Sequence, residues 1–272
     1  MMGDTMKMPP HLAETLGGGD VFEKVMTLQG EVFRDVPGRK TLRVWLAGKP
    51  YFVKQHFGVG WREVFKNLLS LRLPIIGAET EWKAIHKLQQ LGIATTPAVA
   101  YGCRGLSPAA MRSFLITEDL GAIVSLEDFC LDWGAEPPPP RLKRRLIIAV
   151  AELARTLHDN GLNHRDFYIC HLCLDAKRLE SGELFLYLID LHRVGIHAEL
   201  PTSARMKDMA ALYFSALDCG LNARDKLRFL RHYRQRRLRD VLGNEAGFWG
   251  GVSRRADKLY LKFQRLMQAG AA

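Results

Sequence analysis

The sequence lacks any run of 18 or more apolar residues, although hydrophobic residues make up 47% of its 272 positions. A helix needs about 20 apolar residues to cross a bilayer, so no transmembrane helix is predicted. The N-terminus also lacks the apolar segment of a secretory signal peptide, and residues 1–20, which include three consecutive glycines, are predicted to be a flexible tail. Cysteine is scarce, with five residues, and without an export signal these thiols are expected to be reduced in the cytosol.

Acidic residues are too few to balance the basic ones. The chain has 39 Lys and Arg against 29 Asp and Glu, which gives a formal net charge of +10. This excess predicts an anionic partner: a nucleotide, a nucleic acid, acidic lipid headgroups or an acidic protein. Composition does not choose among them, but the apolar content is sufficient for one large domain or two packed lobes.

A hairpin is predicted in the N-terminal third. Residues 41–46 alternate between polar and apolar side chains, residues 47–50 are typical of a turn, and residues 51–54 predict a second strand. That strand ends at Lys54, where a lysine is suited to bind the α- and β-phosphates of ATP. The strand taken alone favours the alternative, an ordinary exposed lysine.

Glycine is nearly absent from the segment where a phosphate-covering loop is expected. Residues 34–40 contain one glycine rather than three, so Arg39 and Lys40 are candidates to contact phosphate by charge. A polar turn is the alternative.

Residues 57–76 mix basic and bulky apolar side chains, which suits a segment lying on an anionic membrane surface, although packing in the core is the more ordinary interpretation.

A helix is predicted from residues 79–91, with apolar side chains at helical spacing and a glycine after it. Glu81 lies near its inward face, where it is a candidate to pair with Lys54 and hold the lysine toward the phosphates. Glu79 is the rival for this role, and a solvent-facing glutamate is the default interpretation of either.

The middle of the chain predicts a buried strand at residues 113–117, followed by a hinge at residues 118–121. Glu118, the first residue of this hinge, is counted among the candidate nucleotide-binding residues. The proline run that ends at Pro140 predicts a surface loop, and an apolar stripe over residues 142–157 predicts a long helix after it.

Two carboxylates follow, each after a short apolar segment. Asp166 ends the string Asn-His-Arg-Asp at residues 163–166, and Asp190 follows a predicted buried strand at residues 184–189. Phosphoryl transfer from Mg-ATP requires one carboxylate that orients the acceptor hydroxyl and takes its proton, and another that holds Mg²⁺ on the nucleotide phosphates. Asp166 is the candidate for the first role and Asp190 for the second.

The order of these elements predicts more than any one of them. Strand hairpin, helix, hinge, long helix, carboxylate loop, strand and second carboxylate follow one another as in bilobal kinases. We therefore predict an α+β, protein-kinase-like fold with a small β-rich N-lobe at residues 21–121 and a mainly helical C-lobe at residues 122–272.

The sequence resembles the bacterial lipopolysaccharide inner-core heptose kinases over roughly residues 28 to 215. The strings that carry this resemblance are Gly30-Glu31-Val32-Phe33-Arg34, Tyr51-Phe52-Val53-Lys54, Ile116-Thr117-Glu118-Asp119-Leu120, Asn163-His164-Arg165-Asp166-Phe167-Tyr168-Ile169-Cys170-His171 and Ile189-Asp190-Leu191-His192-Arg193. The continuation from Tyr168 to His171 is far more specific than His-Arg-Asp alone.

This resemblance implies ATP-dependent phosphorylation of the first inner-core heptose of nascent lipopolysaccharide in a Gram-negative bacterium. It gives Asp166 the catalytic role, Asp190 the metal, Lys54 the phosphates and Glu81 the positioning of that lysine. We accordingly expect a cytoplasmic enzyme, peripheral on the inner face of the inner membrane, with core glycolipid as acceptor. A protein kinase, tyrosine-directed, and an inactive kinase-fold binding module are the rival functions.

The chain departs from protein kinases after each carboxylate. His171 stands where a protein kinase has a metal-binding Asn, and imidazole is a poor Mg²⁺ ligand, so His171 either joins the metal site or forms a hydrogen bond. The segment 191–207 is too short for a long activation loop. Asp208 resembles the buried aspartate that holds the catalytic loop in small-substrate kinases, with a plain N-terminal helix Asp as the alternative.

Two further patterns have alternative interpretations. Cys170 and Cys173 have the C-x₂-C spacing of zinc ligands, but no second pair accompanies them, and small core cysteines are the favoured interpretation. Residues 224–239 carry eight Lys or Arg and predict one basic amphipathic helix. The anionic membrane surface and its glycolipid are favoured as partner, a small acidic protein comes second, and nucleic acid comes third.

Overall fold

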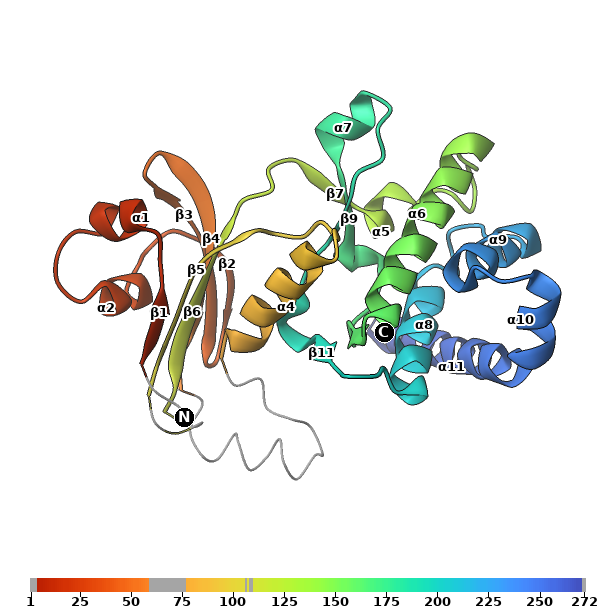
Figure 1. Ribbon diagram of the computed structural model, residues 1–272. Coiled ribbons are helices and arrows are strands. Elements are labelled where there is room, and N and C mark those ends of the chain that lie inside the picture. The colour runs from red at the N-terminus through yellow and green to blue at the C-terminus, as the bar shows by residue number, and fades with distance from the viewer. Residues whose placement is uncertain (1–3, 59–76, 106, 108–109, 271–272) are drawn as a thin grey trace. The chain divides into compact units, whose positions relative to one another are not determined.

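The computed structural model describes residues 4–58, 77–105, 107 and 110–270 (Figure 1). The chain divides into two compact units. Unit 1 comprises residues 1–90 and 95–121, and unit 2 comprises residues 91–94 and 122–272. No helix among the described residues is long and apolar enough to cross a membrane.

Unit 1 is built on an antiparallel six-stranded sheet. Its strand order is β1-β5-β6-β4-β3-β2. The strands are β1 (Thr5–Lys7), β5 (Ala98–Arg104), β6 (Arg112–Glu118), β4 (Lys49–His56), β3 (Arg39–Leu46) and β2 (Glu31–Val36). The hairpin predicted from residues 41–54 is confirmed as β3 and β4, and both strands are longer than predicted. Its turn residues, Ala47 and Gly48, both have positive φ, as the turns that fit the twist of a hairpin require.

The segment 34–40 is a second hairpin rather than an open loop. Val36 of β2 is paired with Arg39 of β3, so only two residues form the turn. Pro37 fixes its own φ, and Gly38 adopts a φ of 80°, which favours glycine. The polar turn, the alternative interpretation of this segment, is therefore what the structure shows.

The N-terminal segment is not the flexible tail that was predicted. β1 pairs with β5, and α1 (Pro10–Thr15) places Leu12 in the core with no exposed surface. α2 (Val21–Met26) adds Phe22 and Val25 to the same core, on one face of the sheet. The glycines at positions 17–19 form the connection between the two helices, and two of them have positive φ. Their conformational freedom allows this tight connection, so a glycine run is no sign of a tail here.

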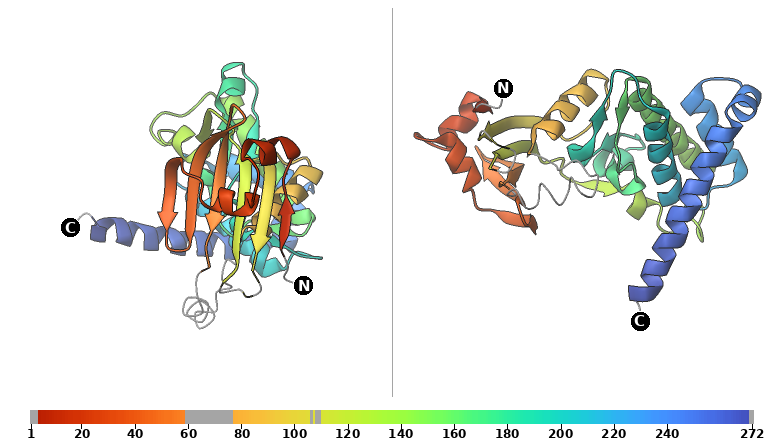
Figure 2. Two further views of the ribbon diagram at one scale, coloured as in Figure 1. Left: turned by 90° about the vertical axis from the view of Figure 1, so that its left-hand side faces the viewer. Right: turned by 90° about the horizontal axis from the view of Figure 1, so that it is seen from below.

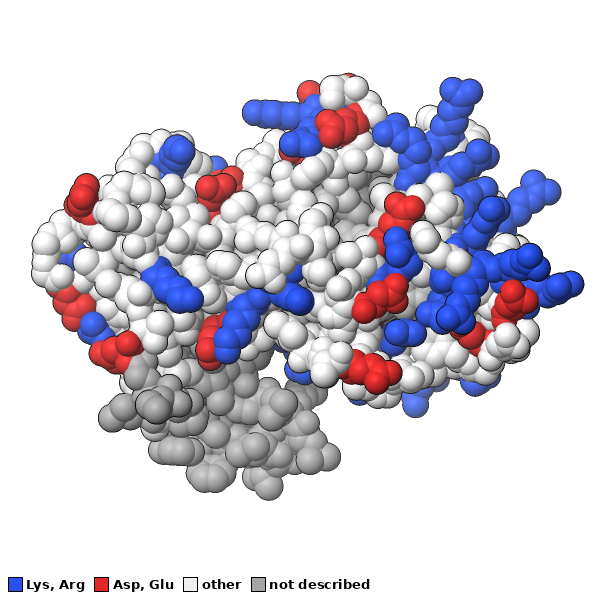
Figure 3. Space-filling model, viewed as in Figure 1, with Lys and Arg blue, Asp and Glu red and all other residues white. Residues whose placement is uncertain are grey.

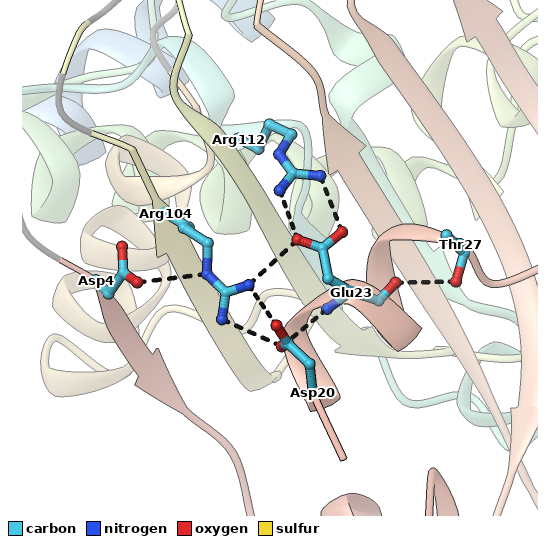
Figure 4. Close-up of polar contacts among 6 residues, drawn as sticks. All are labelled: Asp4, Asp20, Glu23, Thr27, Arg104 and Arg112. Carbon is cyan, nitrogen blue, oxygen red and sulfur yellow. Dashed lines mark hydrogen bonds and ion pairs between the residues drawn. The ribbon is translucent and has the colours of Figure 1, made fainter.

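An ion-pair network fixes this N-terminal segment to the sheet (Figure 4). Arg104 of β5 contacts Asp4 at 3.4 Å and Asp20 at 2.6 Å, and Arg112 of β6 contacts Glu23 at 2.5 Å. Hydrogen bonding to Arg104 lowers the pKa of Asp20, and hydrogen bonding to Arg112 lowers the pKa of Glu23. Individual exposed pairs stabilise little, but this network joins residues more than 80 positions apart.

The other face of the sheet carries α4 (Glu79–Gln90), so the predicted helix 79–91 is confirmed to within one residue. Its inner side chains Ala84, Ile85 and Leu88 are fully buried. The interpretation of residues 57–76 as a membrane-lying segment falls almost wholly on residues 59–76, which lie outside the described residues.

Unit 2 is mainly helical. Its α-helices are α5 (Leu126–Phe129), α6 (Pro140–Asp159), α7 (Ala176–Glu180), α8 (Thr202–Ser215), α9 (Ala223–Arg234), α10 (Leu238–Asn244) and α11 (Ala246–Gly270). α6 packs against α9, and α8 packs against α11. Short strands β7 (Ile123–Ser125), β9 (Leu172–Asp175) and β10 (Leu186–Leu188) form one small sheet, and β8 (Leu162–Asn163) pairs with β11 (Gly195–Ile196). A β-rich first unit and a helical second unit confirm the predicted α+β class.

The predicted basic helix over residues 224–239 is wrong in one respect. α9 ends at Arg234, and Gln235 adopts the left-handed conformation with φ of 49° before α10 begins. The periodicity of the basic and apolar residues continues through this break, so one unbroken helix is what the pattern predicts. The strand predicted at 184–189 is confirmed but shorter, as β10.

Candidate active site

The loop that carries Asp166 is held by a buried aspartate. Asp208 of α8 has no exposed surface and accepts hydrogen bonds from the backbone N–H groups of His164 at 2.6 Å and Arg165 at 2.9 Å. Arg165 has a φ of 69°, a conformation that non-glycine residues adopt only when their surroundings enforce it. Asp208 lies inside α8 and not at its N-terminus, so it has the loop-holding role that its resemblance implied.

A buried chain of polar groups continues from Asp208 to α9. His158 of α6 lies with Nε2 at 3.4 Å from the Asp208 carboxylate and Nδ1 at 2.7 Å from the hydroxyl of Tyr233. All three side chains are at most 2% exposed. This chain of side chains from three helices connects the basic helix α9 to the backbone of the loop that carries Asp166.

The same loop is tied to the strand that leads to Asp190. The Nε2–H of His164 donates to the carbonyl of Ile189 at 2.9 Å. Burial lowers the pKa of His164, so its imidazole is neutral at neutral pH. Asp190 follows with a φ of 61°, the second non-glycine residue of this site in the left-handed region. One buried imidazole thus fixes the two carboxylate-bearing segments to each other within unit 2.

Asp166 is paired with a residue that the sequence did not single out. The Nη1 of Arg193 lies 2.8 Å and 3.0 Å from the two carboxylate oxygens of Asp166. Arg193 ends the 3₁₀ turn η2 (Leu191–Arg193), directly after Asp190. Its one signal in the sequence was its place at the end of the string Ile189-Asp190-Leu191-His192-Arg193, which is among the strings that carry the resemblance.

His171 lies between the two carboxylate segments. Its Nδ1–H donates to the backbone carbonyl of Asp166 at 2.7 Å, and its Nε2 lies 3.6 Å from Asp190. A hydrogen bond with the side chain of Cys170 is the main cause that raises the pKa of His171 to about 9. Asp190 also contacts Nδ1 of His192 at 2.5 Å. The described residues contain no group of three or more His, Cys, Asp or Glu side chains arranged for a metal ion.

The candidate lysine and its partner come together in unit 1. Lys54 of β4 forms an ion pair with Glu81 of α4, and their side chains are 16% and 2% exposed. The rival Glu79 is 55% exposed and pairs with Lys83 at 2.7 Å. The predicted pairing of Lys54 with Glu81 is therefore confirmed. The second carboxylate oxygen of Glu81 is buried and has no hydrogen-bond partner among the described residues.

The other candidate nucleotide-binding residues differ in position. Arg39 lies on the same face of the sheet as Lys54, because alternate residues of β3 share a face and Thr41 is paired with Lys54. Lys40 lies on the opposite face of the sheet. Its partner in β4, Gln55, points toward α2 and donates a side-chain hydrogen bond to the Val25 carbonyl of that helix. The structure therefore does not bring Lys40 together with Lys54.

Glu118 ends β6 and is exposed. Its neighbour Asp119 is fixed by an ion pair with Arg43 of β3 at 2.7 Å and is 8% exposed. Asp119 thus attaches the hinge segment to the sheet. The side chain of Glu118 takes no part in this attachment and is exposed.

Residues 23–233 match the model of the lipopolysaccharide kinase (Kdo/WaaP) family. The chain belongs to this family. It is 52% identical, over 91% of its length and 93% of the relative's, to the lipopolysaccharide core heptose(I) kinase WaaP of Pseudomonas aeruginosa. It is 45% identical to the protein of the same name from Escherichia coli K12, over 93% and 96% of the two chains.

A solved structure, WaaP in complex with acyl carrier protein, is similar to this chain with a TM-score of 0.81 and 46% identity. The similarity covers 94% of this chain and 99% of that one. The protein-kinase-like fold predicted from the order of elements is therefore confirmed, and membership of a kinase family implies use of ATP.

Proposed function

We propose that this protein transfers the γ-phosphoryl group of ATP to a hydroxyl of the first inner-core heptose of lipopolysaccharide. The acceptor oxygen forms a bond to the γ-phosphorus while the bond to the β,γ-bridging oxygen breaks, ADP leaves and the hydroxyl proton passes to a carboxylate. The observation that carries this proposal is the Asp166 loop, fixed by Asp208 and His164, in a chain closely related to named heptose(I) kinases.

Within unit 2 we assign Asp166 as the catalytic base. Its carboxylate is accessible enough to meet a hydroxyl, with 18% of the side chain exposed, and Arg193 fixes its orientation. Arg193 is a cation beside the reacting oxygens, where negative charge gathers during transfer. Only its Nη1 contacts Asp166, so its other N–H groups could contact the transferring phosphoryl group while Asp166 stays oriented.

Asp190 is the proposed Mg²⁺ ligand, since its carboxylate oxygens are of the kind that this ion prefers. When bound, the ion neutralises charge on the β- and γ-phosphates. His171 fits a hydrogen-bonding role better than a ligand role, because imidazole nitrogen is a poor ligand for Mg²⁺ and its Nδ1–H already donates to the Asp166 carbonyl. His171 would thus hold the backbone of Asp166 near Asp190.

Within unit 1 we assign Lys54 to the α- and β-phosphates and Glu81 to its positioning. Arg39, on the same face as Lys54, remains a candidate phosphate contact, and its buried Nε has no hydrogen-bond partner among the described residues. Glu118 remains a candidate on the hinge. The opposite orientation of Lys40 argues against a phosphate contact for that residue.

The test is consumption of ATP by the purified protein with core glycolipid that lacks heptose phosphate, followed by location of the new phosphate on the product. Phosphate on the first heptose is expected. Phosphate on protein tyrosine, with none on the glycolipid, would favour a protein kinase instead. Absence of any ATP turnover, with ATP still bound, would favour an inactive binding module.

A small acidic carrier protein is the partner that the basic surface of unit 2 fits best. Exposed cations gather on α6 and around α9 and α10 (Figure 3), namely Arg141, Arg144, Arg224, Arg231, Arg236, Arg237 and Arg239. Two arginines within residues 224–239 form ion pairs inside unit 2, since Arg228 pairs with Asp225 and Arg234 pairs with Glu245. The related WaaP structure is a complex with acyl carrier protein, which supports the same kind of partner for this chain.

An apolar cavity lies beside this basic surface. Its volume is about 320 Å³, and its lining includes Trp133, Leu146, Leu212, Phe229 and Trp249. Phe229 belongs to α9, so the cavity and the basic surface share a helix. Ligand pockets in proteins typically begin at about 300 Å³, and a space with so few polar groups suits a hydrocarbon chain. We propose that the acyl group of the carrier protein occupies it.

The double variant Arg236→Glu/Arg237→Glu should abolish binding of purified acyl carrier protein in a low-salt titration. Lys49→Glu/Lys177→Glu, which reverses two exposed cations elsewhere, is the matched control and should bind normally. Equal binding by both variants would remove the basic surface as the docking site.

We propose that the protein acts at the cytoplasmic face of the inner membrane, where ATP and the glycolipid acceptor are both present.

A further inference from the structure

The last turns of α11 carry large apolar side chains that are largely exposed in the described part of the chain. Residues 261–269 are all exposed, and they include Leu261, Phe263, Leu266 and Met267. Leu266 and Met267 are 62% and 61% exposed. Figure 2 shows this end of the helix running past the other helices of unit 2. Single exposed apolar residues are ordinary, but a cluster on one helix marks an interaction surface.

These side chains continue a stripe that begins in the core. Val252 and Ala256 are buried where α11 packs on α8, and the ring of Phe263 lies 6.0 Å from that of Phe214 in α8. Leu266 and Met267 follow at helical spacing, three and four residues after Phe263. Leu261 lies off this stripe. The helix therefore keeps its apolar face beyond the part of it that packs against α8.

The same turns carry only positive charge. Lys258, Lys262 and Arg265 fall within about 60° of one another around the helix axis, along one edge of the apolar stripe. The last acidic residue of the chain is Asp257. An apolar stripe bordered by cations is the pattern of helices that lie in the interface of an anionic bilayer.

We propose that the C-terminal end of α11 lies in the surface of an anionic phospholipid bilayer. Phe263, Leu266 and Met267 enter the boundary between headgroups and acyl chains, and the three cations contact the headgroup phosphates. The inference rests on the proposed function, because a glycolipid acceptor requires the enzyme to work at a membrane. It differs from the basic surface around α9, which is assigned to the carrier protein.

The shape of this surface favours lipid over protein. A projecting helix end needs a groove in a protein partner, whereas lipid has no fixed shape and closes around the side chains. A second copy of this chain would bring the like charges of Lys258, Lys262 and Arg265 close together. A bilayer with acidic headgroups has the charge that complements them.

The test is sedimentation of the full-length protein with vesicles of phosphatidylcholine alone and of phosphatidylcholine with phosphatidylglycerol, without ATP or acceptor. The unmodified protein should bind the acidic vesicles at least roughly tenfold more tightly. Leu266→Glu/Met267→Glu should reduce that binding by more than about tenfold, since it removes the apolar contact and adds repulsion. Helix content by circular dichroism confirms that the variant is folded.

Gln264→Glu/Gln268→Glu is the matched control, because it adds the same two charges to exposed positions on the other side of the same turns. It should bind clearly more tightly than the stripe variant. Equal loss in both variants would overturn the insertion of the stripe, and so would unchanged binding in the stripe variant. A protein that is dimeric in solution and becomes monomeric only in the stripe variant would assign the stripe to a second copy instead.

The proposed kinase activity is measured separately, with a short soluble core saccharide as acceptor. The stripe variant should phosphorylate this acceptor at the rate of the unmodified protein, while it loses activity on glycolipid embedded in vesicles. Loss on both acceptors would overturn a membrane role. Vesicle binding by a protein that phosphorylates neither acceptor would reject the proposed function and leave the bilayer contact standing.

Discussion

In the proposed mechanism, the ion pair with Arg193 sets the orientation of the Asp166 carboxylate toward the acceptor hydroxyl. Arg193→Ala should lower kcat by roughly 10- to 100-fold, the value of one charge-assisted contact, with a smaller change in the KM for ATP. Arg193→Lys should restore part of that loss, because a cation remains. A steady-state measurement on core glycolipid separates kcat from KM.

The control is Arg178→Ala. Arg178 is 44% exposed against 46% for Arg193, and it forms a similar ion pair with Glu183 at 3.2 Å. This variant should have unchanged kinetics. If the alanine variants at both positions behave alike, the contact of Arg193 with Asp166 has no part in catalysis.

Lys54 and Glu81 should act as one unit. Lys54→Ala should raise the KM for ATP and lower kcat by roughly tenfold or more, because it removes a cation from the phosphates. Glu81→Ala should have a weaker effect of the same kind, and the double variant should be less than additive in a double-mutant cycle. Glu79→Ala, which breaks only an exposed pair with Lys83, is the control and should be neutral. Strict additivity would mean that the two residues act separately.

For single residues, the sequence predicted those contacts that follow from local periodicity. The 3.6-residue repeat of α4 turned Glu81 inward and left Glu79 outside, and the period of two in β4 placed Lys54 toward Glu81. Arg193 was missed because its contact depends on a left-handed Asp190 followed by a 3₁₀ turn, which no side-chain pattern encodes.

Among the elements, α6, α8 and α9 are joined by the buried chain from Tyr233 through His158 to Asp208. Tyr233→Phe leaves Nδ1 of His158 without a partner, which should reduce the free energy of unfolding by about 1–3 kcal/mol. Because Asp208 also holds the backbone of the loop that carries Asp166, kcat should fall as well. Urea denaturation and steady-state kinetics measure the two effects.

Tyr213→Phe is the matched control for this change. The hydroxyl of Tyr213 accepts a hydrogen bond from Lys226 at the surface, where water can replace it. Its stability should change by less than about 0.5 kcal/mol. Equal effects of the two substitutions would show that the buried chain has no special importance for α9 or for the loop.

Elements with regular periodicity were predicted to within a few residues, as β3, β4, α4 and α6 show. Errors arose where tertiary contacts override local preference. The glycines at 17–19 indicated a tail, but the ion pairs of Arg104 and Arg112 and the burial of Leu12 hold the segment on the sheet. The break at Gln235 interrupts a pattern that continues on both sides of it.

For the whole molecule, the order of elements predicted two units of different class, and the structure has them. The excess of positive charge predicted an anionic partner without locating it. The structure separates two positive surfaces within unit 2, the arginines around α9 beside an apolar cavity and the cations along the exposed end of α11. A count of charges could not make that distinction, because it depends on which arginines are already paired.

Transfer of phosphate to core glycolipid by the unmodified protein and by Asp166→Ala, with ATP affinity measured in parallel, tests the central claim most directly. We expect the variant to bind ATP within about twofold of the unmodified protein and to lose roughly 10²- to 10⁴-fold in transfer rate, because Asp166 acts on the acceptor hydroxyl. Transfer at an undiminished rate, or a loss of ATP affinity as large as the loss of rate, would contradict this account.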